Sequence, residues 1–402
     1  MSVADRSETT GCPVVTLNVS EGGKKPGEWV TIMDGLRAQS RLLFDDFGPA
    51  GGFFIPTRHD DILEILQDPE TFSSTAVTIF DPDPSYQWIP EMLDPPEHTT
   101  WRQQLGPLFS PKQIDRLEDK VRARAVELIE ELKGKESCDY VAEFSARFPT
   151  TIFLELMGLP VDELDKFLEW ERGILYVDDG TAEGQAKMGQ SMMEVMGYFG
   201  ELIEQRRAEP RDDIVSKALT FDVGGRPPTQ EELGSFCLLM FMAGLDTVTQ
   251  NLNYVMHHMA THPEDRRRIV EDPALIPGAI EECVRAYSIV APARKATKDT
   301  EIAGCPVKAG QMVMVSLATA NRDDSFMPDG TTVKIDRNPN NHIGFGAGPH
   351  RCLGSHLARR EMKIALEEWH TRFPEYRLAD DADIKEHGGM YGIDTLPLVL
   401  GS

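Results

Sequence analysis

The sequence predicts a mainly α-helical protein with a small β portion, and two patterns of apolar residues support that prediction. Apolar side chains recur at helical spacing through most of the chain after residue 60. Residues 288–317 instead alternate between apolar and polar side chains and turn at Gly304 and Gly310, which is typical of short strands. The segments with helical spacing are 60–67, 111–134, 140–157, 162–175, 185–207, 229–260 and 264–287, followed by a last helix at about 353–371.

The two ends of the chain complete the predicted element order. Residues 1–40 carry Pro26 and Gly27 and are expected to form a loose lead-in. Residues 41–60 contain the apolar run Phe53–Pro56 and are expected to form a short strand pair. A second hairpin is expected near Asp394–Leu400. The length of 402 residues alone suggests two or three domains, but no repeat or low-complexity linker divides the chain.

Composition and charge exclude several classes of protein. The formal net charge is −25, which argues against binding to nucleic acid or to an anionic membrane. The first 25 residues lack an apolar signal region, and the longest apolar run, Phe236–Leu245, is too short to span a bilayer. The six cysteines show no paired spacing and are expected to be reduced. We therefore expect a cytoplasmic protein without a membrane anchor.

The most informative segment is the glycine-rich run Phe345–Gly354, which contains one cysteine, Cys352. Its glycines allow sharp turns and a close approach to a flat ligand, and amides near the start of the next helix favour a thiolate. A thiolate bound to haem iron favours cleavage of the O–O bond. Three other interpretations are a dinucleotide loop, a hydrolytic pair of Cys352 with His350, and a simple buried cysteine.

Two further motifs precede this loop. Glu282 and Arg285 stand at i and i+3, where they share a helix face and can pair; alone, such a pair is commonly an ordinary solvated one. Asp246 and Thr247 follow Gly244 in the middle of a long predicted helix, although an acid and a hydroxyl compete there for backbone hydrogen bonds. That cost is tolerable if the helix opens locally to hold water or dioxygen. Otherwise the segment is a plain core helix with one buried hydroxyl.

Together the three motifs resemble those of the cytochrome P450 monooxygenases. The oxygen-activating helix of that family has the pattern Ala/Gly-Gly-x-Asp/Glu-Thr-Thr/Ser, which residues 243–248 resemble. Val248 replaces the last Thr or Ser, but the acid–alcohol pair is intact. The resemblance implies the cytochrome P450 fold, a single domain over residues 1–402, and haem b held between the oxygen-activating helix and the cysteine helix. By position, it assigns Cys352 to the iron, Asp246 and Thr247 to oxygen activation, and Glu282 and Arg285 to a structural pair. The residues assigned to the haem surface are Phe345, Gly348, Gly354, Ala243 and Gly244. Those assigned to the haem propionates are His98, Arg102, Arg294 and His350.

Within that family the chain looks most similar to the camphor-hydroxylase type. Tyr86 stands where those enzymes have a tyrosine that hydrogen-bonds the substrate, although a tyrosine in a solvent-facing loop is an equally open interpretation. Pro292 replaces an aspartate of that type, so a small cyclic terpenoid or a similar lipophile is expected rather than camphor itself. The other expected substrate contacts are Phe80, Leu239, Met242, Val290, Met390 and Tyr391.

The resemblance also implies external electron donors, because the chain has no flavin or iron–sulfur motif. The expected partners are a 2Fe-2S ferredoxin and an NAD(P)H-dependent ferredoxin reductase, with O2 and a small lipophilic molecule as substrates. Two alternatives remain, a peroxide-driven peroxygenase and a non-catalytic haem-thiolate binder. Local clusters of basic residues are expected to receive the ferredoxin; they comprise Arg102, Lys112, Arg116, Lys120, Arg122 and Arg124, and Arg351, Arg359, Arg360 and Lys363.

Overall fold

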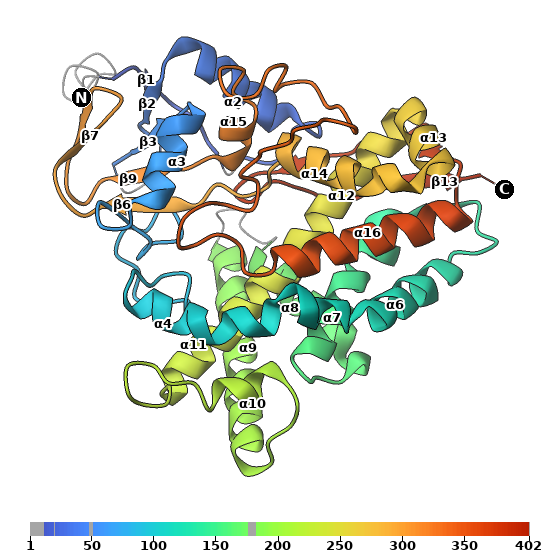
Figure 1. Cartoon of the computed structure of the whole chain (residues 1–402), viewed down its shortest axis with the longest axis horizontal. Coiled ribbons are helices and arrows are strands. Elements are labelled where there is room, and N and C mark those ends of the chain that lie inside the picture. Colours follow the sequence, from blue (N-terminus) through green and yellow to red (C-terminus); the bar gives the residue numbers. More distant parts are fainter. Residues whose placement is uncertain (1–11, 20, 48–50, 176–181, 402) are drawn as a thin grey trace.

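The computed structural model describes residues 12–19, 21–47, 51–175 and 182–401; residues 1–11 of the expected lead-in lie outside that part. It confirms a mainly α-helical fold with a small β portion (Figure 1). The α-helices of the described chain are α2 (Glu28–Gln39), α3 (His59–Gln67), α4 (Glu97–Leu105), α5 (Pro111–Asp115), α6 (Glu118–Glu130), α7 (Arg147–Leu156), α8 (Leu164–Leu175), α9 (Ala182–Ala208), α10 (Ile214–Ala218), α11 (Gln230–Gly244), α12 (Asp246–Thr261), α13 (Pro263–Glu271), α14 (Ile276–Ala286), α15 (Leu317–Asn321) and α16 (Ser355–Arg372).

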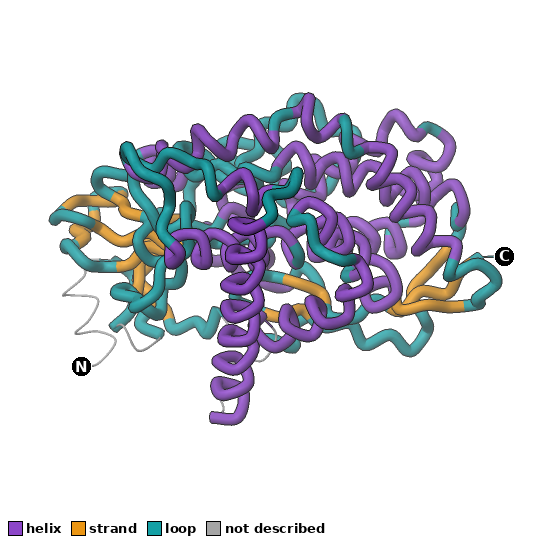
Figure 2. The backbone as a smooth tube through the Cα atoms, turned by 90° about the horizontal axis from the view of Figure 1, so that it is seen from below, coloured by secondary structure: helices purple, strands orange, loops and turns teal. Residues whose placement is uncertain are grey.

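The strands form small groups beside the helical body (Figure 2). In the part of the chain that the structure describes, the largest sheet has the order β1-β2-β3-β9-β6-β4, a second has the order β10-β13-β5, and β7-β8 and β11-β12 pair separately. The strands are β1 (Val14–Val15), β2 (Leu42–Asp45), β3 (Phe53–Pro56), β4 (Phe72–Ser73), β5 (Ser137–Asp139), β6 (Ala293–Ala296), β7 (Thr300–Ile302), β8 (Cys305–Val307), β9 (Met312–Met314), β10 (Tyr376–Leu378), β11 (Glu386–His387), β12 (Gly392–Ile393) and β13 (Pro397–Leu400).

Two strand predictions are confirmed, whereas the predictions for the lead-in and for the C-terminal hairpin are wrong. β2 and β3 form the expected antiparallel pair, and β6 to β9 occupy 293–314, with positive φ angles at Gly304 and Gly310. The lead-in is not loose throughout, because α2 buries Trp29 and Met33. The expected terminal hairpin is also wrong: β13 pairs with the distant strands β10 and β5, whereas the hairpin of this region is β11-β12.

Three long predicted segments are divided into separate α-helices, and the first of them, 111–134, separates into α5 and α6. The segment 229–260 separates into α11 and α12 at Leu245, whose ψ of −69° departs from helical geometry. The segment 264–287 separates into α13 and α14 around Pro273, which lacks an amide hydrogen. α11 begins with a capping box, because the side chains of Thr229 and Glu232 accept hydrogen bonds from each other's backbone amides.

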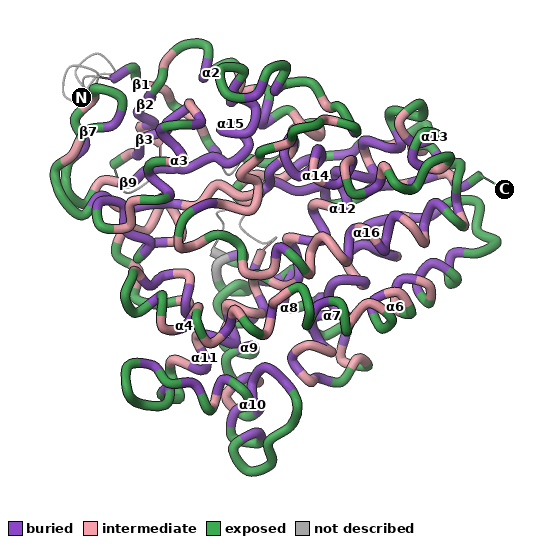
Figure 3. The backbone as a smooth tube through the Cα atoms, in the orientation of Figure 1, coloured by how far each residue is buried: buried purple, intermediate pink, exposed green. Residues whose placement is uncertain are grey.

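The helix α12 lies at the centre of the fold, where it contacts α7, α14, α16 and the β12 strand. Figure 3 shows that the backbone of α12 and its neighbours is largely buried. Trp369 of α16 is fully buried, and its ring contacts those of Tyr140, Phe144 and Tyr376. Aromatic burial of this kind supplies much of the apolar stabilisation of a core. The stretch Gln230–Thr261 is long and apolar enough to cross a membrane, contrary to expectation, but 56% of its most apolar window is buried inside the protein.

The cysteine prediction needs one correction. Cys12 and Cys305 form a disulfide that joins the N-terminal segment to β8, so not all six cysteines are reduced. The pair is separated by 293 positions in sequence, and no local spacing reveals a pair brought together only by the fold. The remaining four, Cys138, Cys237, Cys283 and Cys352, are free.

Candidate active site

The cysteine loop has the tight turns that its glycines suggest. Gly346 and Gly348 have φ angles of +74° and +66°, and a Cβ on Gly348 would overlap the carbonyl oxygen of Leu66. The amide of Cys352 donates to the carbonyl of Phe345 at 2.8 Å, which closes the loop. Only a glycine therefore permits the loop to lie against the end of α3 while it presents Cys352.

Cys352 differs from the other free cysteines in being exposed, whereas Cys138, Cys237 and Cys283 are buried. The buried-cysteine interpretation is therefore wrong. Surrounding protein still desolvates the sulfur and raises the pKa of the Cys352 thiol, although the Gly354 amide and the Arg102 charge oppose that rise. The Gly354 amide favours the thiolate, as the sequence suggests, although desolvation has the larger effect on the pKa of the Cys352 thiol. A bound metal cation would reverse that balance.

Four predicted propionate ligands come together from distant segments. His98 lies on α4 and Arg294 on β6, and the rings of His98 and His350 are 4.0 Å apart between centroids. All four ring nitrogens of these histidines are buried without a hydrogen-bond partner in the described chain. Burial, followed by the charges of His350 and Arg102, lowers the pKa of His98 to about 3. Such a set of buried, unsatisfied groups is costly unless an acceptor fills it.

The two arginines of this set also lack a carboxylate partner. Arg294 is 3% exposed, and its side chain donates to the neighbouring carbonyl of Ala293, while Arg102 donates to the carbonyl of Arg351 at 2.6 Å. Among the described residues, neither arginine has a carboxylate oxygen within 4 Å, and Glu91 approaches only His350, at 3.7 Å. Burial lowers the pKa of Arg294. These donors fit a ligand that carries carboxylates, as the propionates of haem do.

The break between α11 and α12 places two neighbouring residues in different surroundings. The Thr247 hydroxyl donates to the carbonyl of Ala243 at 3.0 Å, and Ala243 is exposed. Asp246 is fully buried, and its Oδ1 accepts a hydrogen bond from Gln250 Nε2 at 2.9 Å. A Cβ on Gly244 would lie 2.9 Å from the Phe153 ring, so this glycine allows α11 to pack closely on α7.

Asp246 lines a cavity of about 690 Å³, which we call the inner chamber. Its charged residues come from α8, α9, α12 and the segment around β11 and β12: Glu171, Arg172, Lys187, Asp246, His387 and Asp394. Sequence reasoning missed Glu171, Gln250, His387 and Asp394. No local pattern marks them, because they meet only through tertiary packing.

The predicted substrate contacts occupy several environments. Leu239 and Met242 are half-buried on α11, near the exposed Ala243. Tyr86 is 41% exposed, and its ring lies 5.5 Å from that of Trp88. Met390 lines the inner chamber.

The remaining three contacts lie in apolar packing. Phe80 contacts the rings of Phe47 and Phe53, Val290 packs against two apolar clusters, and the buried Tyr391 stacks on Trp29. The assignment of all seven residues to the substrate stays a prediction.

The Glu282–Arg285 pair is buried, not solvated. Both side chains are 0% exposed and form two hydrogen bonds of 2.8 Å. Arg285 also donates to the carbonyls of Asn321, Gly330 and Thr332. The pair therefore ties α14 to the segment that leads into the cysteine loop.

Comparison with known proteins agrees with this geometry. The family model "Cytochrome P450" matches residues 181–374. The chain is 36% identical to the probable cytochrome P450 127A1 of Sinorhizobium fredii over 86% of this chain and 83% of that protein. It is 31% identical to the vitamin D(3) 25-hydroxylase of Pseudonocardia autotrophica over 88% and 89%. The solved structure of CYP101J2 is similar with a TM-score of 0.87 and 31% identity, over 97% of both chains.

Proposed function

Because the chain belongs to the cytochrome P450 family, we propose that it is a haem-thiolate monooxygenase that hydroxylates a small lipophilic molecule, a cyclic terpenoid. The proposed cofactor is haem b, and the proposed electron donors are a 2Fe-2S ferredoxin and its NAD(P)H-dependent reductase in the cytoplasm. Members of this family named among its relatives include hydroxylases, which agrees with monooxygenase chemistry. The alternative substrates are a steroid, a fatty acid or an aromatic compound.

One observation carries the proposal: the exposed Cys352 lies two residues from His350, whose buried, unsatisfied ring nitrogens lie beside those of His98. Cys352 would hold the iron, and His98, Arg102, Arg294 and His350 would hold the propionates. When bound, the thiolate-ligated haem supplies activation of dioxygen. A dinucleotide or a hydrolytic substrate would leave this donor set unexplained.

The roles of Asp246 and Thr247 follow from their positions. The Thr247 hydroxyl lies beside the exposed Ala243, and its bond to the Ala243 carbonyl fixes the direction of its proton. Asp246 lies behind the helix break and next to the inner chamber, so its carboxylate can receive protons from that side. Thr247 offers its hydroxyl oxygen as a hydrogen-bond acceptor on the Ala243 face, and Asp246 delivers protons toward that hydroxyl. Replacing Thr247 with Ala should divert turnover from product to hydrogen peroxide.

The substrate class rests on the side chains beside Ala243. Leu239 and Met242 give this face of α11 an apolar surface, and Tyr86 offers one hydroxyl for orientation. The relatives act on varied molecules by name, including mycinamicin IV, vitamin D(3) and methyl-branched lipids. CYP101J2 is one of several similar bacterial structures, so the camphor-hydroxylase type is not singled out by similarity alone.

An optical titration tests the substrate class. Cyclic terpenoid ketones, steroids, fatty acids and aromatics are added in turn to the haem-loaded protein, and the shift of iron to high spin is recorded. The proposal predicts the largest shift with one cyclic terpenoid ketone, and a weaker affinity for it in Tyr86→Phe. A shift with steroids or fatty acids only would keep the enzyme class and reject the terpenoid.

The ferredoxin surface is narrower than the sequence suggests, because many of the basic residues have internal partners. Arg122 pairs with Glu118, Glu367 and Glu368; Arg124 with Glu127 and Glu155; Arg359 with Glu281; Arg360 with Asp115 and Glu118; and Lys363 with Glu367. Within the described ranges, Lys112, Arg116, Lys120 and Arg351 are exposed and have no carboxylate oxygen within 4 Å. We assign the docking role to these four. Arg351→Glu should slow reduction by the ferredoxin at low salt, and Arg124→Glu should not.

A further inference from the structure

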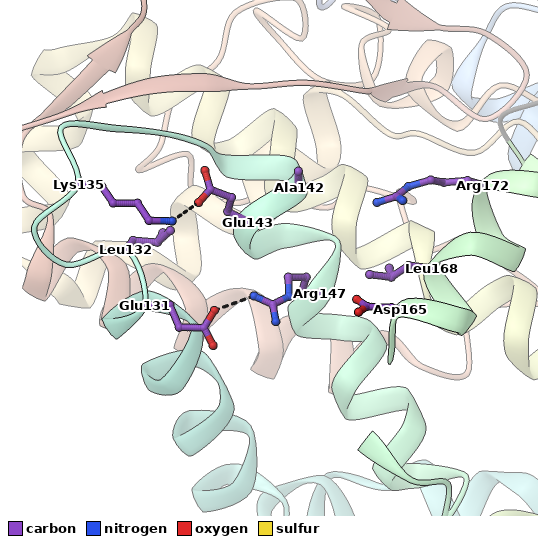
Figure 4. A pocket seen from close by; sticks show the side chains of 9 residues that line it. All are labelled: Glu131, Leu132, Lys135, Ala142, Glu143, Arg147, Asp165, Leu168 and Arg172. Atoms are coloured by element: carbon purple, nitrogen blue, oxygen red, sulfur yellow. Dashed lines mark hydrogen bonds and ion pairs between the residues drawn. The ribbon is translucent and has the colours of Figure 1, made fainter. Parts of the chain in front are cut away.

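A second cavity lies beside the inner chamber, which is itself lined in part by exposed residues such as Arg172 and Lys187. This outer chamber is a cavity of about 380 Å³ whose wall includes Glu143, Arg147 and Asp165 (Figure 4). Both chambers are lined by Ala142, Leu168 and Arg172. The two spaces therefore share a wall.

Charged side chains surround the outer chamber, and most of them pair with each other. Lys135 pairs with Glu143, and Arg147 with Glu131, as Figure 4 shows. Arg172 is exposed and has no carboxylate oxygen within 4 Å in the described part of the chain. A chamber with such walls holds water readily, since its polar groups supply hydrogen-bond partners.

On the inner side, the orientation of Asp246 is fixed by a rigid amide. Gln250 Oε1 accepts from the backbone amide of Ile393 at 2.7 Å, so its Nε2 is the atom that donates to Asp246 Oδ1. Gly392 allows this arrangement, because a Cβ there would overlap both Gln250 and the ring of His387. The Asp246 carboxylate is thus held at the chamber wall by a donor that cannot turn away.

Two further titratable groups of the inner chamber act on Asp246. Glu171 is 4% exposed, and burial, followed by the charge of Asp246, raises the pKa of Glu171 well above its ordinary value. His387 Nδ1 lies 2.7 Å from Asp394 Oδ1, and this bond and the charges of Asp394 and Asp246 outweigh burial to raise the pKa of His387. Two nearby carboxyls in a poorly solvated site keep one proton between them.

We propose that Glu171 is the residue that returns protons to Asp246, which receives them from solvent through the outer and inner chambers. In each transfer the O–H bond of the Glu171 carboxyl breaks and an O–H bond forms on Asp246, directly or through one water. Glu171 is left as a carboxylate, and a proton that bulk solvent supplies along the chamber waters restores its O–H bond, so that no hydroxide remains in the chamber. The inference rests on the proposed function, because it concerns the supply of protons to the same Asp246.

Among the residues that the structure describes, the charged groups that face this transfer come from three elements around the inner chamber. They are Arg172 beside Glu171 on α8, Lys187 on α9, and His387 and Asp394 on the β11–β12 segment. Burial and the charge of Asp246 raise the pKa of Glu171, whereas the charge of Arg172 lowers it. Removing its charge in Arg172→Gln should therefore strengthen proton retention by Glu171 and move the alkaline limb of the turnover profile to higher pH.

The test compares Glu171→Gln with Glu361→Gln in the haem-loaded enzyme. Glu361 is 3% exposed on α16, burial also raises its pKa well above the ordinary value, and it lines neither chamber. In Glu171→Gln we expect the thiolate–carbonyl spectrum and substrate affinity to persist. Product formation should fall by about 10- to 100-fold, with more peroxide and a larger solvent isotope effect. Glu361→Gln should show none of these changes, and Glu171→Asp, which keeps an exchangeable proton, should recover part of the rate.

Infrared difference spectroscopy gives a readout that does not depend on turnover. Wild-type enzyme at neutral pH should show protonated-carboxyl absorption with a component that shifts in D2O. That component should be absent from Glu171→Gln and persist in Glu361→Gln, which should lose a different component. A second variant, Ala142→Trp, places a large side chain where the two chambers share a wall. It should slow turnover without removing the component that Glu171→Gln lacks.

The outcomes separate this inference from the function on which it rests. Slow turnover in Asp246→Asn with normal turnover and an unchanged carboxyl band in Glu171→Gln would overturn the role of Glu171 alone. Normal coupling in both Asp246→Asn and Thr247→Ala would instead overturn the proton-delivery part of the proposed function. An unchanged rate in Ala142→Trp would overturn the route through the two chambers.

Discussion

The cysteine loop and the inner chamber are built in different ways. Ten consecutive residues, Phe345–Gly354, form the loop, and their conformation is set by local glycine geometry. The charged residues of the chamber come from α8, α9, α12 and the β11–β12 segment, and they meet only in the folded chain. A loop of the first kind can be recognised from a motif, whereas a chamber of the second kind depends on packing that no short sequence pattern encodes.

The largest expected effect concerns the buried pair that supports the cysteine loop. Arg285→Met would leave Arg337 as the remaining cation paired with Glu282 and would remove the donor that three backbone carbonyls share, so we expect a loss of about 3–5 kcal/mol in the free energy of unfolding. Urea denaturation measures it. The matched control is Arg377→Met, which removes an exposed i,i+3 pair with Asp380 and should leave the unfolding midpoint unchanged. Equal effects of the two variants would show that the Glu282–Arg285 pair does not brace the fold.

The next effect separates the two motif glycines of the loop. Gly348→Ala places a side chain at a positive φ and against the Leu66 carbonyl, so we expect about 1–3 kcal/mol of destabilisation and less haem retained. Gly354→Ala meets nothing within 4 Å and should retain haem normally. Thermal unfolding and haem content measure both. If Gly354→Ala were the more damaging variant, the close contact of Gly348 with the Leu66 carbonyl would not explain why the loop has glycines at these positions.

The sequence motif does not distinguish Gly348 from Gly354, and sequence patterns fail to distinguish structural features elsewhere in the chain as well. The periodicity of 229–260 predicts helix but does not reveal that Leu245 ends one helix and begins another. The apolar run near Leu400 predicts a strand, yet its partners β10 and β5 depend on long-range packing. By contrast, the Glu282–Arg285 pair and the β2–β3 pair rest on neighbours in sequence, and both were predicted.

A smaller effect is expected in the pH dependence of the cofactor-free protein. The pKa of folded His98 is about 3, below its ordinary value of 6.5, so the unfolded chain binds more protons at intermediate pH. His98 therefore contributes stability that is fully present above about pH 6.5 and is lost as the pH falls toward 3. Urea midpoints at pH 7 and pH 5 measure this loss. His98→Asn should flatten the dependence, and the exposed His356→Asn should not. Haem loading should also reduce it if propionates bind His98; no change on loading would contradict that contact.

The smallest effect concerns the disulfide, which lies away from both regions. Denatured, unreduced protein should show four reactive thiols, and reduction should raise the number to six. Mass spectrometry after alkylation locates the additional two at Cys12 and Cys305. Six thiols before reduction would mean that this link is absent in the isolated protein.

The central claim is that Cys352 holds haem as a thiolate, and the carbon monoxide spectrum of the reduced protein tests it most directly. Wild-type protein and the Cys237→Ala control, which changes a buried cysteine outside the loop, should both show the Soret band of a thiolate–carbonyl complex. Cys352→Ser should lose that band. The same band in Cys352→Ser, or its absence from correctly folded, haem-loaded wild-type protein, would contradict the account.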